Sequence, residues 1–285
     1  MKNLDTGTEH LLARIENNVG YLTMNRPEAR NAMSSEMNRA LQEKIAEFEL
    51  NEEVRCIVLT GAGNAFCAGG DVKGMNAKNE GNGEEDTIDK AIHRQRDNQR
   101  GTSGKLYKMP KPTIASLPGA AAGAGLSYAL SCDLRIMSSA AFMTTAFAKV
   151  GFSGDYGGTY FMSQLIGSAK ARELYFLSDR VSAEEALNLG LTNWVVDAES
   201  LEAKTKEIAE QLAAGPSVAF RYMKENLNRA MNGDVDECLD LEATHHVHCG
   251  QTTDHKNAVK AFVEKNNPNF QENKIKDFLR RAECF

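Results

Sequence analysis

The stretch TIASLPGAAAGAG, residues 113–125, joins three kinds of local pattern. Residues 113–117 are apolar or β-branched except for Ser116 and predict a buried strand, and Pro118-Gly119 predicts a turn after it. The small residues that follow lead into an apolar segment, which predicts a helix through residue 130. Small side chains let a ligand approach the backbone, and the first N–H groups of a helix attract negative charge, so this turn suits an anion or a developing oxyanion. Tight packing of the helix on the strand would explain the same residues.

A second glycine-rich turn, GAGNAFCAGGD at residues 61–71, follows another predicted strand. The dinucleotide-binding pattern requires Gly or Ala three places after Gly63, where Phe66 stands, so we do not expect that kind of site. The later glycines of this turn nevertheless repeat the strand-to-glycine pattern of residues 113–125. One backbone donor from each turn could converge on a single oxygen, which is the requirement of an oxyanion hole.

The rest of the chain alternates strand and helix patterns before it becomes helical. Apolar–polar alternation around Asn17-Asn18 predicts a β-hairpin, and Ser182 with Glu185 forms a capping box. Residues 76–89 are polar and predict a mobile loop, followed by a polar helix to about residue 100. We expect an α/β layer with a C-terminal helical extension. The expected strands are 54–60, 113–117, 134–137 and 194–196, and the expected helices are 34–50, 159–166, 169–177, 182–189 and most of the chain after 201, with a break at Gly215-Pro216.

Length, composition and charge exclude several classes of protein. The chain has 285 residues, of which 42% are apolar, and a chain of this size can bury a full core, which excludes disorder. Its 33 Lys and Arg against 39 Asp and Glu give a net charge of −6 without a basic block, so we expect no nucleic-acid partner. Since no apolar run is long enough to span a bilayer, we expect no membrane association.

The N-terminus and the cysteines indicate the compartment. The first ten residues are polar and include Asp5 and Glu9, which fits neither a secretion signal nor a transit peptide. Six cysteines lie far apart in the sequence and form no CxxC pair. Because this distribution is typical of reduced thiols, we expect a cytoplasmic protein without a disulfide framework.

Two other arrangements of reactive residue types are weaker signals. GLSYA at residues 125–129 has the letters of a serine-hydrolase elbow, but Ser127 falls inside the expected helix rather than at a sharp turn after a strand. His245 and Cys249 stand at i and i+4, a spacing that can bind a metal, yet no third ligand accompanies them. We therefore expect no metal site and no resident cofactor.

Taken together, the motifs resemble those of the enoyl-CoA hydratase/isomerase (crotonase) superfamily over about residues 10–270. The resemblance implies a crotonase-like spiral of ββα turns in residues 1–200, with the active site and the CoA site, and a C-terminal helical region in residues 201–285 that builds homotrimers or hexamers. It also implies an acyl-CoA thioester as substrate, with coenzyme A entering only as part of it. The matching motifs are NRP (25–27), NA (31–32), AFCAGGD (65–71), KPTIA (111–115), GAAAGAG (119–125), CDLR (132–135), GGT (157–159), SAEEA (182–186), GL (190–191) and AFVEK (261–265).

The same resemblance assigns residues to the site. The two oxyanion-hole donors become the backbone N–H groups of Gly70 and Ala124. Family members usually have Gly at the second position, and a methyl group is tolerated there if φ is negative. A neighbouring subunit's terminal helix would contribute Phe262 and Lys265. The expected contacts of substrate and CoA within the chain are Arg26, Ala29, Ala68, Gly69, Phe147 and Tyr156.

The acid–base groups depart from the hydratase pattern. Hydratases of the family resemble one another in two glutamates, at the positions of Ser127 and Phe147 here, and both are absent. Some members carry the working carboxylate at the position of Asp155, and one carboxylate suffices to move a proton between C2 and C4 of an enoyl thioester. We therefore expect Δ3,Δ2-enoyl-CoA isomerisation with Asp155 as the only acid–base group. An apolar wall of Phe147, Phe152 and Tyr156 would raise its pKa by desolvation.

Several alternatives remain open from the sequence. An enoyl-CoA hydratase could activate water through Asp155 with Ser127 or Tyr156, and an acyl-CoA thioester hydrolase or a ring-cleaving enzyme could use Asp155 on water or as a nucleophile. A non-catalytic acyl-CoA-binding protein of the same fold would explain the missing glutamates. Finally, Asp155 could merely cap the helix expected near Gly158.

Overall fold

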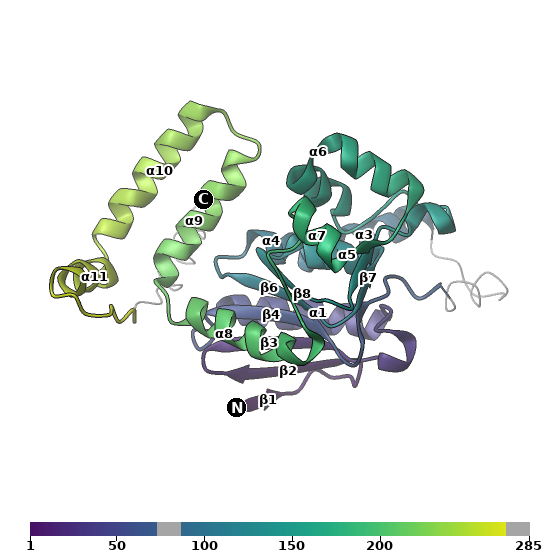
Figure 1. The fold of residues 1–285 in the computed structure, drawn as a ribbon, viewed down its shortest axis with the longest axis horizontal. Helices are drawn as coiled ribbons and strands as arrows, with labels where there is room; N and C mark the ends of the chain where they lie inside the picture. Colours follow the sequence, from purple (N-terminus) through teal and green to yellow (C-terminus); the bar gives the residue numbers. More distant parts are fainter. Residues whose placement is uncertain (73–86, 272–285) are drawn as a thin grey trace.

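A seven-stranded sheet runs through the described part of the chain, residues 1–72 and 87–271 of a computed structural model (Figure 1). In order across the sheet, its strands are β1 (Lys2–Leu4), β2 (Leu11–Glu16), β3 (Val19–Met24), β4 (Cys56–Gly61), β6 (Thr113–Leu117), β8 (Leu134–Ser138) and β11 (Trp194–Val196). β1, β2 and β3 pair antiparallel, and every pair from β3 onward is parallel. The predicted hairpin turns at Asn17 and Asn18, whose φ values of 50° and 62° asparagine tolerates well.

A second sheet, built of short strands, lies beside β4 and β6. Its order among the described residues is β10 (Val181–Ser182), β9 (Phe142–Thr144), β7 (Ala120–Ala122) and β5 (Ala65–Cys67). β5 follows β4, β7 follows β6 and β9 follows β8, and helices come after each pair. This repeated order of long strand, short strand and helix is the ββα spiral that the sequence predicts, so the predicted fold class is confirmed.

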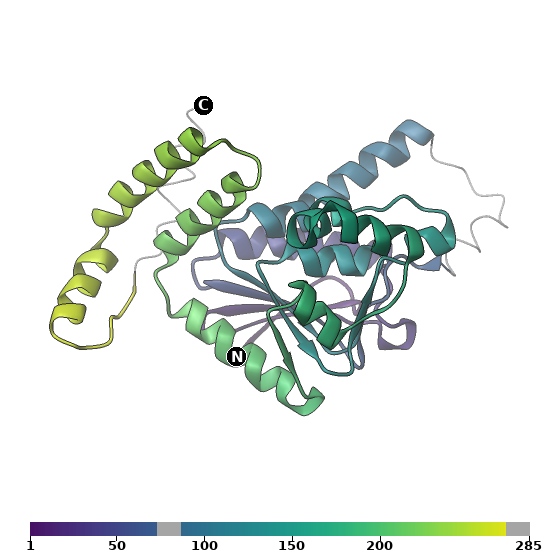
Figure 2. The same ribbon diagram turned by 45° about the horizontal axis from the view of Figure 1, so that its top comes forward.

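Helices cover both faces of the large sheet (Figures 1 and 2). Successive residues of a strand point to opposite faces, and the core divides accordingly. Leu22 and Leu59 join the larger core cluster with residues of α1, whereas Tyr21 and Val58 join a smaller cluster with residues of α8. The helices are α1 (Ser35–Leu50), α3 (Ile88–Gly101), α4 (Ser103–Lys108), α5 (Ala124–Ser131), α6 (Gly158–Leu177), α7 (Ala183–Leu189), α8 (Leu201–Ala213), α9 (Ser217–Ala230), α10 (Val235–Gly250) and α11 (Thr253–Val263), with 3-10 turns η1 (Pro27–Ala29), η2 (Phe147–Val150) and η3 (Ala198–Ser200). Within the described ranges, no helix combines the length and the apolar character needed to cross a bilayer.

Local sequence signals explain where several helices begin and bend. α1 starts after Ser34, whose hydroxyl accepts a hydrogen bond from the backbone N–H three residues later, as the predicted helix at 34–50 requires. The two helices expected before residue 177 form the single helix α6, in which Gly167, with a φ of 77°, makes a kink. The predicted loop at 76–89 lies almost entirely outside the described residues, and the polar helix expected after it is α3.

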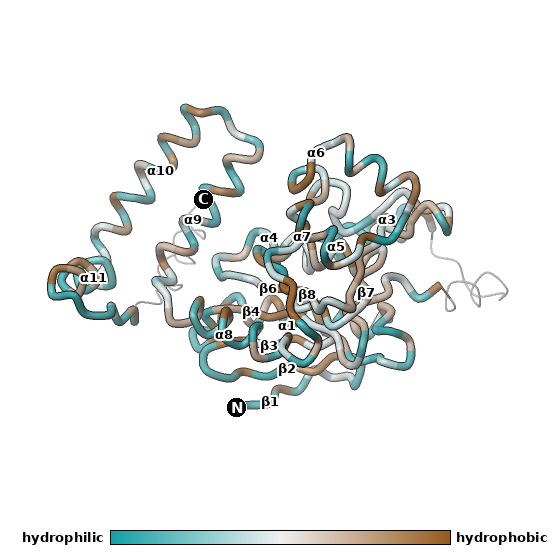
Figure 3. The backbone as a smooth tube through the Cα atoms, viewed as in Figure 1, coloured by the Kyte–Doolittle hydropathy of each residue, from teal (hydrophilic) through white to brown (hydrophobic). Residues whose placement is uncertain are grey.

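The last helices separate into two groups. α8 packs on the large sheet, where Leu201 and Ala209 belong to the smaller core cluster. α9, α10 and α11 instead form an arm that projects from the rest of the molecule (Figures 1 and 2). Hydrophobic residues recur among hydrophilic ones along this arm (Figure 3), and some of them are exposed, including Leu227 at 68% and Phe262 at 84%. The arm comprises the helices after α8, and the division into residues 1–200 and 201–285 stays a prediction. Homotrimer or hexamer formation stays a prediction.

A buried lysine fastens the arm to the core. The Nζ atom of Lys224, on α9, donates hydrogen bonds to the carbonyl oxygens of Leu106 at 2.9 Å and Lys111 at 3.2 Å. It also donates to Oδ2 of Asp133 at 2.8 Å, and that oxygen accepts a further bond from the Thr113 N–H. The base of the arm is therefore held by one cation and three oxygens inside the protein.

Replacing Lys224 by Met should lower the free energy of unfolding by about 2–4 kcal/mol, because the Asp133 carboxylate and two carbonyls lose their donor. Chemical denaturation measures this difference. The matched control is Lys260→Met, since Lys260 is 75% exposed and its ion pair with Glu264 spans 3.9 Å. The control should change stability by no more than about 0.5 kcal/mol. Equal effects of the two substitutions would contradict the anchoring role.

Candidate active site

The two glycine-rich turns meet at one edge of the small sheet. β5 and β7 pair in parallel, so residues 68–70 and 123–124 leave the sheet side by side. A Cβ atom added to Gly69 would lie 2.7 Å from the carbonyl oxygen of Ala122 and 3.4 Å from the amide nitrogen of Ala124. This closeness, together with a φ of 90°, requires glycine at position 69. The two segments that the sequence singles out are thus neighbours in space.

Both predicted oxyanion-hole donors are available. No described residue accepts a hydrogen bond from the backbone N–H of Gly70 or Ala124. Ala124 is the first residue of α5, so its N–H also carries part of the positive charge of a helix N-terminus. Its φ is not positive, and its side chain packs in the larger core cluster, so the methyl group is accommodated. An oxygen between the two amides could accept from both.

Asp155, on the loop between η2 and α6, is a partly buried carboxylate for which the described residues supply no hydrogen-bond donor. Its Oδ1 atom is inaccessible and accepts no hydrogen bond from the described residues. Burial raises the pKa of Asp155 from 3.8 to about 6. The N-cap of α6 is Gly157, and no side chain caps that helix. The alternative that Asp155 merely caps a helix is therefore wrong.

The loop that carries Asp155 is held in an unusual backbone conformation. Gly154 has a φ of 111° and Tyr156 a φ of 49°. The Tyr156 N–H donates to Oε1 of Gln99 on α3 at 2.6 Å, and the Tyr156 ring packs edge-on against Tyr128 of α5 with the centroids 4.9 Å apart. A left-handed tyrosine costs about 1 kcal/mol or more, and contacts of this kind are what sustain it. Two helices therefore determine where the carboxylate lies.

Two stacked rings connect the Asp155 loop with the oxyanion-hole turn. The centroids of Phe147 and Tyr175 are 5.9 Å apart and their planes differ by 12°. The Phe147 ring comes within 3.7 Å of the place that a Cβ on Gly123 would take, and the Tyr175 ring within 3.2 Å of the same point on Gly154. The ring pair therefore forms a continuous apolar surface between the two parts of the site.

Electrostatic effects also relate the carboxylate to the end of β5. Burial raises the pKa of the Cys67 thiol to about 12, and the charge of Asp155 contributes to that rise. Burial likewise raises the pKa of Tyr175, again with a contribution from Asp155. Cys67 directly precedes residues 68–70, so the Asp155 carboxylate lies near enough to the end of β5 to affect a group there.

The wall around Asp155 differs from the prediction in one residue. Phe147 and Tyr156 are buried as expected, but Phe152 is 57% exposed and does not shield the carboxylate. Tyr175 takes its place in the wall, although the sequence does not predict it there. Tyr175 lies near the end of α6, and no motif marks it, because only the course of α6 brings it back to the loop.

The predicted CoA contacts within the chain lie close to the glycine turns. Ala29 ends η1, and its N–H donates to the carbonyl oxygen of Arg26 at 2.9 Å. The Arg26 guanidinium turns toward the protein, where its two Nη atoms each lie 3.3 Å from Oδ2 of Asp71. Contact of these residues with CoA stays a prediction.

The two residues expected from a neighbouring subunit lie on the arm. Phe262 is near the end of α11, and Lys265 follows that helix with a φ of 58°. Within this chain, α11 lies on the other side of the molecule from α5 and α6 (Figure 1). Phe262 is exposed rather than part of a core, and its role against a second chain stays a prediction.

The predicted i, i+4 pair on α10 has ordinary helix–helix contacts. His245 lies with Nδ1 2.6 Å from Oδ1 of Asn226 and with Nε2 3.2 Å from the Glu225 carboxylate. In the part of the chain that the structure describes, no group of three or more His, Cys, Asp and Glu is arranged to hold a metal ion.

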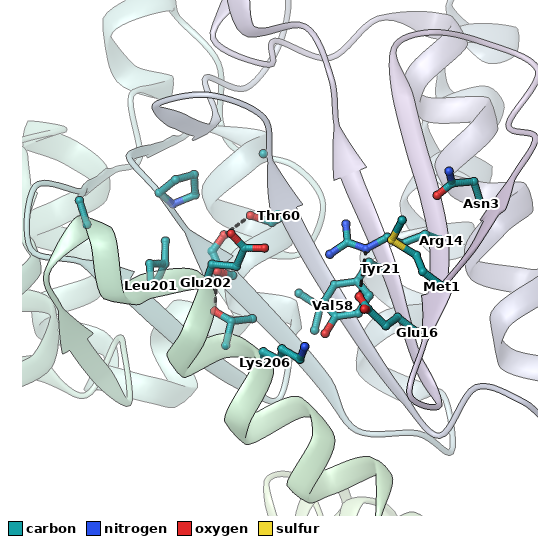
Figure 4. A pocket seen from close by; sticks show the side chains of 15 residues that line it. Met1, Asn3, Arg14, Glu16, Tyr21, Val58, Thr60, Leu201, Glu202 and Lys206 are labelled. Atoms are coloured by element: carbon teal, nitrogen blue, oxygen red, sulfur yellow. Dashed lines mark hydrogen bonds and ion pairs between the residues drawn. The ribbon is translucent and has the colours of Figure 1, made fainter.

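A large hollow of about 730 Å³ lies between α8 and the face of the seven-stranded sheet on which α8 packs (Figure 4). Tyr21 and Val58 line it from the sheet, and Glu202 and Lys206 line it from α8. Tyr21 and Val58 belong to the smaller core cluster, whereas Ala124 belongs to the larger one. The hollow is therefore separate from the two amides and Asp155, and none of the predicted site residues lines it.

The sequence matches the enoyl-CoA hydratase/isomerase family over residues 14–273. The chain belongs to this family. The assignment of the Gly70 and Ala124 amides to an oxyanion hole stays a prediction.

Similar proteins include both isomerases and hydratases of the enoyl-CoA hydratase/isomerase family. A 1,2-epoxyphenylacetyl-CoA isomerase of Escherichia coli (strain K12) is 35% identical over 262 residues, which cover 92% of this chain and 98% of that protein. A short-chain-enoyl-CoA hydratase of Clostridium acetobutylicum is 36% identical over 88% of this chain and 93% of that protein. Because one relative is named an isomerase and the other a hydratase, the comparisons do not identify the reaction of this chain.

Solved structures of family members share the fold closely. An enoyl-CoA hydratase subunit from Geobacillus kaustophilus HTA426 has a TM-score of 0.84 and 34% identity, covering 93% of this chain and 99% of that one. An enoyl-CoA hydratase from Polaromonas sp. JS666 has a TM-score of 0.85 and 31% identity, covering 92% and 99%. The crotonase fold of this chain is thereby confirmed independently of its own strand order.

Asp155→Asn should raise the free energy of unfolding at pH 8 by about 2–3 kcal/mol, since a carboxyl pKa raised from 3.8 to about 6 penalises the charged folded form. The sign follows from linkage. The penalty is absent below the unfolded pKa, grows between pH 4 and 6, and is complete above about pH 6. Denaturant unfolding of wild type and variant at pH 4 and pH 8 measures it, with exposed Asp179→Asn as the control. A variant no more stable than wild type at pH 8 would contradict the buried, unpaired state of Asp155.

Proposed function

We propose that this enzyme moves the double bond of 3-enoyl-CoA thioesters to the 2-position, with Asp155 as the only acid–base group and coenzyme A entering as part of the substrate. The observation that carries the proposal is the state of Asp155. Its Oδ1 atom is buried without a donor among the described residues, and burial raises its pKa to about 6. A base whose pKa lies near neutrality can both take a proton and return it.

In the proposed reaction, the thioester oxygen accepts hydrogen bonds from the N–H groups of Gly70 and Ala124. Ionised Asp155 takes a proton from C2, and the electron pair of that C–H bond delocalises onto the thioester oxygen as a dienolate. The two amide donors stabilise the charge that develops there. Protonated Asp155 then gives the proton to C4, which leaves the double bond between C2 and C3. Atoms and charge balance without a second reactant.

The neighbours of Asp155 favour isomerisation over hydration. Adding water requires one group that activates the water and a way to protonate the α-carbon, which family hydratases do with two carboxylates. Here Ser127 is buried in α5 with its hydroxyl 3.4 Å from the carbonyl oxygen of Gly123, and Phe147 is stacked on Tyr175. Burial is the cause of the raised pKa of Asp155, and no other carboxylate of the described residues contributes to that rise.

The names of the relatives support two candidate reactions. The Escherichia coli relative is named an isomerase of an acyl-CoA, which favours proton transfer without net addition. The Clostridium acetobutylicum relative is named a short-chain-enoyl-CoA hydratase, so hydration with water activated by Asp155 is the second candidate. A soluble acyl-CoA-utilising enzyme of the cytoplasm fits either reaction.

Asp155→Asn should lower turnover of 3-enoyl-CoA by about 10³-fold or more, because the amide neither takes nor returns the proton, while the KM changes little. Formation of the conjugated thioester, followed by its ultraviolet absorbance, measures the rate. Ser127→Ala is the matched control and should retain a rate within about threefold of wild type, since the Ser127 hydroxyl donates to the Gly123 carbonyl at 3.4 Å and the smaller side chain leaves the helix intact. Near-normal turnover by Asp155→Asn would contradict the assignment.

Supplying 3-enoyl-CoA and 2-enoyl-CoA in parallel, with measurements of free CoA and of binding, distinguishes isomerisation from the alternative functions. Fast conjugation of 3-enoyl-CoA with slow hydration of 2-enoyl-CoA supports the isomerase. Faster hydration supports the hydratase, release of free CoA supports the thioester hydrolase, and calorimetric binding without turnover supports a non-catalytic acyl-CoA-binding protein.

The pH dependence of kcat/KM should report Asp155. Only the ionised carboxylate can take the proton from C2, so kcat/KM should fall as the pH decreases through about 6, approaching a tenfold loss per pH unit below it. Initial rates between pH 4.5 and 8, in buffers of constant ionic strength, measure this limb. A plateau that persists down to pH 4.5 would mean that a carboxylate of ordinary pKa, or no carboxylate, is the base.

A further inference from the structure

Residues 26–33 run alongside the segment that ends at Gly70. The Ala68 N–H donates to the carbonyl oxygen of Arg30 at 2.9 Å, and the Met33 N–H donates to that of Gly69 at 2.8 Å. Met33 and Gly70 form an isolated parallel bridge. The chain on the N-terminal side of Gly70 is therefore bonded to residues 26–33 at successive positions.

One of these bonds determines the direction of the Gly70 donor. The carbonyl of Gly69 and the N–H of Gly70 belong to the same planar trans peptide and point in opposite directions. Since Met33 holds the Gly69 carbonyl, the Gly70 N–H points away from residues 26–33. A Cβ on Gly69 would lie 3.4 Å from the amide nitrogen of Ala124, so the second predicted donor is close to this peptide.

An ion pair holds the residue on the C-terminal side of Gly70. Nη1 and Nη2 of Arg26 each lie 3.3 Å from Oδ2 of Asp71, and Nη1 also donates to the carbonyl oxygen of Ala32 at 2.7 Å. The Arg26 side chain is 16% exposed, and its Nε atom is buried without an acceptor among the described residues. A charge-assisted pair that is partly shielded from water is stronger than a surface pair.

We propose that Arg26 and Asp71 are positioning residues of the oxyanion hole, and this inference rests on the proposed function. Glycine at position 70 has no side chain with which to hold its own peptide, so its neighbours have to restrain it. Met33 restrains the peptide before Gly70, and the Arg26–Asp71 pair restrains the residue after it. Without the pair, Gly70 stays at the same place in the fold, but the direction of its N–H bond toward the thioester oxygen is no longer fixed.

Positioning by Arg26 and the CoA contact that the family resemblance implies for Arg26 predict different changes in KM and kcat. A contact with CoA phosphates would raise the KM when Arg26 is removed and leave kcat nearly unchanged. Removing the carboxylate of Asp71 would then free Arg26 for the phosphates and lower the KM. Positioning predicts instead that either change lowers kcat, because an oxyanion donor acts in the transition state.

The test uses Arg26→Met, Asp71→Asn, their combination, and Arg26→Lys as the conservative variant. Turnover of 3-enoyl-CoA gives kcat and KM, and the infrared carbonyl stretch of bound butyryl-CoA, which cannot isomerise, reports how strongly the thioester oxygen is polarised. Arg30→Met is the matched control, because Arg30 lies in the same loop with its side chain exposed. Circular dichroism confirms that each variant folds, and Asp71→Asn serves if Arg26→Met does not.

Positioning predicts that kcat falls about 10- to 100-fold in each single variant while the KM stays within about threefold. The double variant should be no slower than the slower single variant, since both lose the same interaction. The carbonyl shift should shrink in parallel with kcat, and Arg26→Lys should recover part of both. Arg30→Met should match wild type.

Three outcomes overturn the inference. They are a raised KM with unchanged kcat in Arg26→Met, an unaffected Asp71→Asn, and a full carbonyl shift in either variant. If the wild-type enzyme polarises the carbonyl but does not isomerise 3-enoyl-CoA, the proposed reaction is wrong. The carbonyl shift of the variants then still tests the positioning of the Gly70 N–H. A wild-type enzyme that does not polarise the carbonyl overturns both.

Discussion

The parallel pairing of two short strands, β5 and β7, is the constraint on which the whole site depends. Residue 65 faces residue 120 and residue 67 faces residue 121 in this pairing, so the turns that follow run side by side. Larger side chains cannot be placed there, because a Cβ on Gly69 or Gly125 would lie 2.7 Å or 2.3 Å from a backbone oxygen. The small residues that permit this packing are also those that expose two N–H groups. The glycine-rich stretches therefore allow both the tight packing of the two turns and the exposure of two backbone donors.

The second half of the site combines a buried charge with a strained loop. Burial of Asp155 without a donor and the left-handed φ of Tyr156 both oppose folding. Gln99 from α3 and Tyr128 from α5 hold the loop in place, and the Phe147–Tyr175 stack lies beside it. The rest of the fold thus stabilises a loop whose ionised carboxylate would be more stable in water, an arrangement common in active sites. Desolvation gives that carboxylate a pKa suited to moving a proton.

Much of this arrangement could be predicted from the sequence because it depends on local patterns. The strand–turn–glycine repeats predict the ββα spiral. The family resemblance, with Ser127 and Phe147 in place of the two hydratase glutamates, points to Asp155. Phe152 was wrongly expected in the wall, because nearness in sequence does not determine the direction of a side chain when Gly154 turns the backbone at a φ of 111°. Tyr175 and the Arg26–Asp71 pair depend on contacts between segments far apart in the chain, and no local spacing encodes them.

The central claim is that two amides and one carboxylate act on the same thioester group. A crystal structure of the enzyme with butyryl-CoA, a saturated thioester that cannot react, tests it most directly. We expect the thioester oxygen within about 3.2 Å of the amide nitrogens of both Gly70 and Ala124, with the Asp155 carboxylate directed at C2 of the acyl chain. A thioester oxygen beyond reach of either amide, or an Asp155 side chain facing away from C2, would contradict it.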